Sequence, residues 1–247
     1  MRIISRLDIK PPYLIKPIYF EGLRKIGDPK DYIDQYSSEG IDEILYIDVV
    51  SSLYRRPVQF NLIKKSSINV NVPLAVGGGI KTVKDANKII SIGADKVVIN
   101  THLFEDINFL LELANSLGSQ ACVAHIQAKK INNNFECLTD CGRNRTYKNV
   151  FDWARVLEDN GAGEIILSSV DNDGAMKGFN LELADKVINK VNIPVIVGSG
   201  CSSIDDIINL ASLKPSGIAI GSALHFKKLS VNKIKTKLKE AGFMVRI

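Results

Sequence analysis

The sequence predicts an α/β fold, a (β/α)8 barrel of the TIM type that forms a single domain over residues 1–247 and consists of two similar halves. Short apolar runs rich in Val and Ile alternate with longer amphipathic stretches along the chain. These runs are apolar on both faces, which is typical of buried parallel strands. The second half of the chain also resembles the first. Because a doubly wound open sheet has no reason to repeat once at half length, the repeat favours the barrel.

The elements follow one another as strand and helix. The predicted strands contain LDIK (7–10), ILYIDVV (44–50), PLAVGGG (73–79), DKVVIN (95–100), ACVAHI (121–126), EIILSSV (164–170), PVIVGSG (194–200) and GIAIGS (217–222). Helix patterns lie between them, the clearest over residues 28–40, 82–93 and 203–213. Each opens with a polar residue that can cap a helix, and several end near glycine.

The internal repeat sets the number of strands. NVPLAVGGGIKTVKDANKI (71–89) lies over NIPVIVGSGCSSIDDIINL (192–210), an offset of 121 residues (192 minus 71). At an offset of 119, LDIK (7–10) falls on IQAK (126–129). Two copies of a unit with four strand–helix modules give eight strands, which is the number in this kind of barrel.

Composition narrows the class of protein. The chain has 247 residues, 45% of them hydrophobic and 24% charged, which predicts a folded globular protein. No apolar run approaches the roughly 20 residues of a membrane helix, and charges interrupt the start, so we expect a cytoplasmic protein that binds no membrane. The net charge of +5 is spread along the chain, which disfavours nucleic acid and leaves an anionic small molecule open. The four cysteines form no CxxC pair and are expected to be reduced.

Two glycine-rich turns at equivalent positions of the repeat predict two anion sites. The GGG of residues 77–79 and the GSG of residues 198–200 each follow a strand and precede a helix. Small residues there let backbone N–H groups approach an anion at a helix N-terminus. The next strands end in Asn100-Thr101 and Gly221-Ser222, which can complete each cradle. Two such sites would hold the two ends of a bisphosphate.

The loop DNDGAMKG (171–178) is too polar for core packing. It can turn the chain, hydrogen-bond substrate hydroxyls or bind a divalent metal. Because no His or Cys lies at ligand spacing, we expect no metal, and nothing in the sequence indicates a cofactor.

Asp8 is predicted to end the first strand, and its counterpart in the repeat is Gln127. Two opposed carboxylates would supply a general acid and a general base, whereas glutamine cannot exchange a proton near neutral pH. Asp8 can alternatively be structural, bonding loop amides. His125 shares a face with Gln127 one layer deeper, and it is either a core residue or a participant.

Together these residues resemble the cyclase subunit of imidazole glycerol phosphate synthase, a half-barrel-symmetric family of histidine biosynthesis. The resemblance extends from RLDIK to the terminal GFMVRI. In that family a partner glutaminase makes ammonia, which crosses the barrel and attacks a bisphosphorylated ribulosyl formimino carboxamide nucleotide. The resemblance implies that Asp8 is the first catalytic aspartate and that Lys16 faces the substrate. It implies phosphate and substrate contacts at Gly79, Asn100, Thr101, Asp173, Gly174, Gly200, Gly221 and Ser222.

The resemblance also implies a gate for ammonia at the opposite, N-terminal mouth of the barrel. The family closes this mouth with a ring of alternating charges, which match Arg2, Glu43, Lys96 and Glu164. Each of the four starts a predicted strand, so they would converge at one rim and pair. The ring can also be a simple plug. Retention of all four residues favours an ammonia route and a glutaminase partner bound at this face.

Several departures from the family fall on the catalytic face. The second catalytic aspartate is Gln127 here, Pro11-Pro12 and Pro17 replace glycines, Ala75 replaces a hydroxyl residue and Ser199 interrupts the second glycine pair. Loss of one carboxylate predicts a changed reaction. We therefore place first the paralogous branch that uses ammonia to form an amidine on sugars of surface polysaccharides, with a phosphate-bearing or nucleotide-linked substrate.

Three alternatives remain open at this point. The first is the histidine-pathway step itself. The second is a non-catalytic scaffold that only activates the glutaminase. The third is a sibling isomerase of histidine or tryptophan synthesis, which normally uses a carboxylate pair and no ammonia gate.

Overall fold

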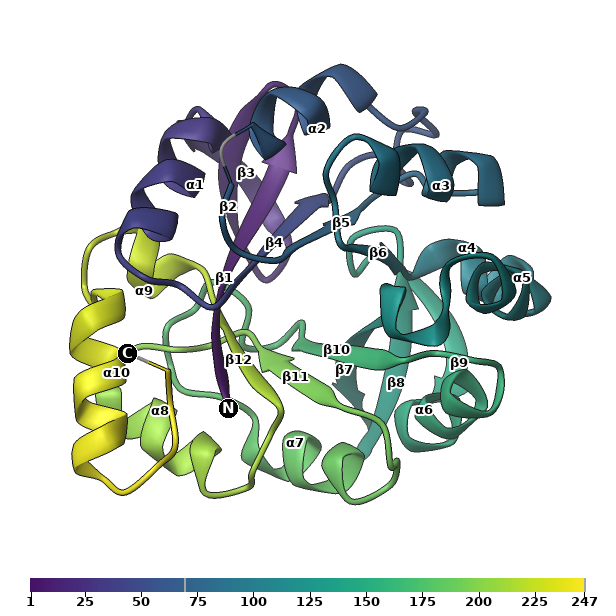
Figure 1. Ribbon diagram of the computed structural model, residues 1–247. Helices are drawn as coiled ribbons and strands as arrows, with labels where there is room; N and C mark the ends of the chain where they lie inside the picture. Colours follow the sequence, from purple (N-terminus) through teal and green to yellow (C-terminus); the bar gives the residue numbers. More distant parts are fainter. Residues whose placement is uncertain (69, 247) are drawn as a thin grey trace.

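Eight parallel strands close into a barrel in a computed structural model that describes residues 1–68 and 70–246 (Figure 1). In order around the barrel they are β1 (Arg2–Lys10), β4 (Glu43–Asp48), β5 (Leu74–Gly77), β6 (Lys96–Ile99), β7 (Cys122–Ile131), β10 (Glu164–Ser169), β11 (Val195–Gly198) and β12 (Gly217–Ile220). The ring closes because β1 pairs with both β12 and β4, and β7 pairs with both β6 and β10. The predicted barrel is therefore confirmed, whereas its extent as one domain over residues 1–247 stays a prediction, since residues 69 and 247 lie outside the described residues.

Helices surround the barrel (Figure 1). They are α1 (Pro29–Ser38), α2 (Phe60–Ser67), α3 (Val83–Ser91), α4 (Thr101–Glu105), α5 (Asn108–Leu117), α6 (Val150–Asp159), α7 (Leu181–Ile188), α8 (Ile204–Ala211), α9 (Ser222–His225) and α10 (Val231–Glu240), with a 3-10 turn at Ser119–Ala121. The three predicted helices begin at the expected caps: the side chains of Asp28, Thr82 and Ser203 accept from backbone N–H groups of the first turn.

Two apolar clusters hold the barrel together. The larger cluster lies between the strands and the helices. The smaller one fills the barrel interior and takes at least one residue from each barrel strand, including the layer Ile4, Leu45, Ala75, Val98, Val123, Ile166, Ile196 and Ala219. Because side chains alternate along a strand, residues two positions further on from this layer also face the interior. Arg6, His125 and Ser168 therefore lie one layer nearer the carboxyl ends of the strands.

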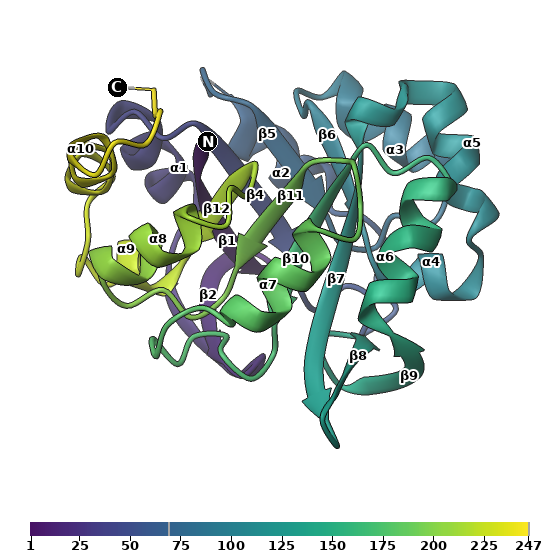
Figure 2. The same cartoon turned by 90° about the horizontal axis from the view of Figure 1, so that it is seen from below.

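Antiparallel hairpins extend β1 and β7 beyond the barrel. β2 (Tyr13–Ile18) and β3 (Glu21–Gly27) follow β1, while β8 (Asn134–Thr139) and β9 (Asn144–Asn149) follow β7. Figure 2 shows β8 and β9 at the end of the barrel opposite to both chain termini. The tip of the first hairpin folds inward: Tyr19 donates its N–H to Asp173 O at 2.7 Å, and Phe20 is buried in the interior cluster. These hairpins were not expected from the sequence.

Candidate active site

At the N-terminal end of the barrel, the four predicted ring residues meet. Arg2 pairs with Glu43 (Nη1 to Oε2, 2.5 Å) and with Glu164. Lys96 Nζ lies 2.9 Å from Glu43 Oε1 and 2.8 Å from Glu164 Oε2. Each side chain thus has two neighbours of opposite charge, because the four residues lie at the starts of β1, β4, β6 and β10. Both glutamates are buried. The expected geometry is confirmed, and the role as a gate stays a prediction.

At the opposite end, a cavity of about 410 Å³ lies beside the carboxyl ends of β4 to β7. Three residues of the first predicted anion cradle line it: Gly79, Asn100 and Thr101. Gly79 has a φ of +75°, and a Cβ there would lie 2.2 Å from Ser51 Oγ, so only glycine fits this turn. The cavity wall also carries Arg55 and Lys81, whose charges favour an anionic ligand.

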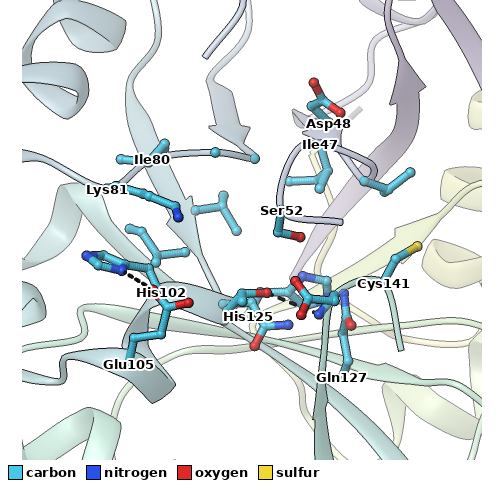
Figure 3. A pocket seen from close by; sticks show the side chains of 18 of the residues that line it. Ile47, Asp48, Ser52, Ile80, Lys81, His102, Glu105, His125, Gln127 and Cys141 are labelled. Atoms are coloured by element: carbon cyan, nitrogen blue, oxygen red, sulfur yellow. Dashed lines mark hydrogen bonds and ion pairs between the residues drawn. The ribbon is translucent and has the colours of Figure 1, made fainter. Parts of the chain in front are cut away.

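Gln127 and His125 line the same cavity (Figure 3). Gln127 Oε1 accepts a hydrogen bond from Gly142 N at 2.7 Å, which orients the side-chain amide. His125 Nε2 lies 2.9 Å from Ser168 Oγ. Burial, reinforced by the charge of Arg6, lowers the pKa of His125 to about 3. The imidazole is therefore neutral at pH 7 and a poor general base.

The second predicted cradle surrounds a smaller cavity of about 20 Å³. Its lining includes the predicted residues Lys16, Asp173, Gly174, Gly200, Gly221 and Ser222. Ser199, which interrupts the glycine pair, has a φ of +77°, a conformation unusual for a residue with a side chain. Its hydroxyl donates to Asp173 Oδ1 at 2.9 Å, which ties the turn to the DNDG loop. The predicted binding residues thus form one group at each cradle, and Lys16 from the first half of the chain lies in the second group.

Asp8 lies in a buried ion cluster. Its Oδ1 is 2.9 Å from Arg6 Nε and its Oδ2 is 2.6 Å from Lys16 Nζ. Lys16 Nζ also reaches Asp173 Oδ2 at 3.3 Å. Burial alone would raise the pKa of Asp8, but the charges of Arg6 and Lys16 outweigh it and hold that pKa well below its usual range. Asp8 is fully buried and lines neither of the two cavities, whereas Gln127 lines the large one.

Arg6 is a site residue that was not expected from the sequence. It stands two positions before Asp8, so strand alternation alone places both on the interior face. Its side chain is only 3% exposed, and it contacts both Asp8 and Ser168 (Nη1 to Oγ, 2.7 Å). Ser168 in turn contacts His125, so Arg6 links the two halves of the site.

We found no group of three or more metal-ligating His, Cys, Asp or Glu side chains in residues 1–68 and 70–246. The four cysteines are buried and free. Within the same residues, no helix combines the length and the apolar character needed to cross a membrane.

Crystals grown in phosphate or sulfate are expected to show an anion at each glycine cradle. The first anion should enter the large cavity near Thr101, where Arg55 and Lys81 supply positive charge. The second should move the residues that enclose the small cavity, which is too small for a phosphate as it stands. The measurement is the electron density of the bound anion at each cradle. Two empty cradles obstructed by side chains would contradict this expectation.

One family model and several known proteins match this chain over most of its length. The family model described as histidine biosynthesis protein matches residues 2–230. The imidazole glycerol phosphate synthase subunit HisF of Legionella pneumophila is 44% identical over 207 residues, which cover 83% of this chain and 98% of that protein. The proteins of the same name from Campylobacter concisus and Pyrococcus furiosus are each 37% identical over 246 residues, which cover 100% of this chain and 98% of theirs.

Proposed function

The chain belongs to the histidine biosynthesis protein family, and we propose that it is the ammonia-using cyclase subunit of an imidazole glycerol phosphate synthase. The names of the three relatives carry this proposal, because each is the HisF subunit of that enzyme and two of them align with the whole chain. A glutaminase subunit, bound at the N-terminal end of the barrel, would supply the ammonia.

The arrangement of the two barrel ends supports the proposal. A charged ring closes the end where the chain starts, and the anion cradles lie at the other end. Ammonia that entered through the ring would cross the apolar interior layer and reach the carboxyl ends of the strands. There the two cradles would hold the two phosphates of the ribulosyl nucleotide, with its reacting carbons between them.

The residues between the cradles would direct the chemistry. Gln127 can orient the substrate by hydrogen bonding but cannot carry a proton. Asp8 holds Arg6 and Lys16 in place through its two carboxylate oxygens. The site therefore relies on fixed charges more than on a pair of proton carriers.

Sugar amidination is the second candidate, and Gln127 is the observation that favours it. Forming an amidine requires ammonia at an activated carbon but no ring closure, so one proton carrier fewer is needed. None of the three relatives' names points to sugar modification. We therefore place the histidine-pathway step ahead of it.

The variant Lys96→Glu tests the proposed ammonia route. The substitution removes the contacts of Lys96 to Glu43 and Glu164. Arg2 then remains the one cation of the ring, beside the carboxylates of Glu43, Glu164 and the new glutamate. In the complex with a glutaminase, glutamine-dependent turnover should fall about tenfold or more below that of the unmodified chain, while turnover with added ammonium chloride should change far less. Both rates are measured as formation of imidazole glycerol phosphate.

The matched control is Lys233→Glu, which reverses an exposed charge on α10. It should leave both rates unchanged. Equal losses with glutamine and with ammonium in Lys96→Glu would contradict the gate. An unmodified chain that makes no imidazole glycerol phosphate from either nitrogen source would contradict the proposed function.

A further inference from the structure

Arg6 combines complete burial with an unused hydrogen-bond donor. Its Nε donates to Asp8 and its Nη1 donates to Ser168. Its Nη2 is buried and has no hydrogen-bond partner among the residues that the structure describes. Buried polar groups are nearly always partnered, and an unpartnered one belonging to a charged group is especially unfavourable. An acceptor brought by a ligand would satisfy it.

The position of Arg6 is central to the site. It lines the small cavity together with Lys16 and Gly221 of the second cradle. Through Ser168 it also reaches His125, which lines the large cavity of the first cradle. Phe20, from the hairpin tip, lies over the guanidinium with its ring centroid 5.3 Å from Cζ. A ligand that spans both cradles must therefore pass close to Arg6.

The guanidinium is also held in a fixed orientation. Asp8 and Ser168 engage two of its nitrogens from two different strands, β1 and β10. Lys16 holds the second oxygen of Asp8, so the carboxylate itself cannot easily turn. A positive charge that is buried and oriented in advance is suited to stabilising negative charge that develops during a reaction.

We propose that Arg6 is a catalytic residue, whose Nη2 donates a hydrogen bond to the oxygen on the carbon that ammonia attacks. This assignment rests on the proposed function and extends it to a residue to which neither the sequence nor the comparisons assign a role. The assignment requires that the electrophile is a carbonyl carbon, because an imine carbon would place no oxygen against the guanidinium.

The step that Arg6 assists is the addition of ammonia to the carbonyl group. The ammonia lone pair forms the new C–N bond, and the π pair of the C=O bond moves onto oxygen. The adduct then carries a positive nitrogen and a negative oxygen, and Arg6 stabilises the oxygen. One proton passes from nitrogen to oxygen and gives a carbinolamine, so no oxidant, reductant or further reactant is needed.

Two substitutions of Arg6 test the assignment, Arg6→Met and Arg6→Lys. Methionine keeps an apolar stem of similar length without the charge, and lysine keeps the charge without the forked donors. With the purified chain, the histidine-pathway nucleotide and saturating ammonium chloride, kcat should fall about 10²-fold in Arg6→Met, as expected on losing one such donor. It should fall about tenfold in Arg6→Lys. The exposed Arg155→Met on α6 is the matched control and should keep full activity.

The KM for the nucleotide and the Kd for inorganic phosphate distinguish a catalytic role of Arg6 from a structural one. A donor used in the transition state lowers kcat but leaves the KM for the nucleotide and the Kd for inorganic phosphate nearly unchanged. A merely structural Arg6 would instead raise the KM for the nucleotide and the Kd for phosphate with little change in kcat, and that result would overturn the assignment. Unchanged kcat in Arg6→Lys or in Arg6→Met would overturn it as well. An inactive unmodified chain contradicts the proposed function together with the assignment, whereas an active chain with equally active variants contradicts the assignment alone.

Discussion

Asp8→Asn is expected to lower turnover of the nucleotide with added ammonia by about 10³-fold or more. The carboxylate of Asp8 is the common partner of Arg6 and Lys16, with contacts of 2.9 and 2.6 Å. Asparagine keeps the shape but removes the charge, so two buried cations lose their shared counter-ion. Lys16 would keep Asp173, while the guanidinium of Arg6 would keep only Ser168.

The same substitution should also lower the free energy of unfolding, by about 3 kcal/mol at pH 7. The direction with pH follows from the lowered pKa of Asp8. A carboxyl group whose pKa is lower in the folded state stabilises the protein above its ordinary pKa, and this contribution is lost as the pH falls below about 4. The difference in unfolding free energy between the unmodified chain and Asp8→Asn should therefore shrink in acid. Urea denaturation at several pH values measures it.

Asp42→Asn provides the matched control. Asp42 is also buried, pairs with Lys235 (Oδ1 to Nζ, 2.6 Å) and accepts from Ile3 N, but it lies immediately before β4 and lines neither cavity. The Asp42→Asn variant should have a lower free energy of unfolding but the same turnover as the unmodified chain. If Asp8→Asn turned over substrate as fast as Asp42→Asn, Asp8 would have no special part in the reaction.

Gln127→Asp is expected to raise formation of imidazole glycerol phosphate, by about 10²-fold or more if proton transfer limits the rate. Two other titratable groups on the wall of the large cavity are poorly suited to this task. The pKa of His125 is lowered to about 3, and Glu105 pairs with His102. A carboxylate at position 127 would face the same cavity.

Gln127→Asn is the matched control, because it has the shape of aspartate and no exchangeable proton near neutral pH. Both variants shorten the side chain that accepts from Gly142 N, so they share any structural cost. The rate ratio between Asp and Asn at this position isolates the proton carrier. Equal rates in the two variants would mean that another group moves the proton.

The fold could be predicted because its determinants are local or repeated. The strand runs are apolar on both faces, and the caps Thr82 and Ser203 occupy equivalent positions of the two halves. The hairpin tip could not be predicted, since Tyr19 and Phe20 are held by contacts with the loops around Asp173 and Cys141, more than 100 residues away in the sequence. Such contacts leave no periodic pattern in the chain.

The residues of the site could be predicted from the sequence better than the contacts between them. Strand alternation placed His125 and Gln127 on one face, where both line the large cavity, and the repeat grouped residues that line one cavity each, while their binding roles stay predictions. The state of Asp8 was not predictable from spacing alone. It depends on Arg6 from the same strand and on Lys16 from the hairpin, and only the three-dimensional arrangement shows that both cations reach the same carboxylate.

The measurement that tests the proposed function most directly uses the unmodified chain, ¹⁵N-labelled ammonium chloride and the histidine-pathway nucleotide. Mass spectrometry of the products follows the label. The proposal predicts imidazole glycerol phosphate that carries one ¹⁵N atom, formed without a glutaminase present. Recovery of the nucleotide unchanged, under conditions in which the chain is folded and binds phosphate, would contradict it.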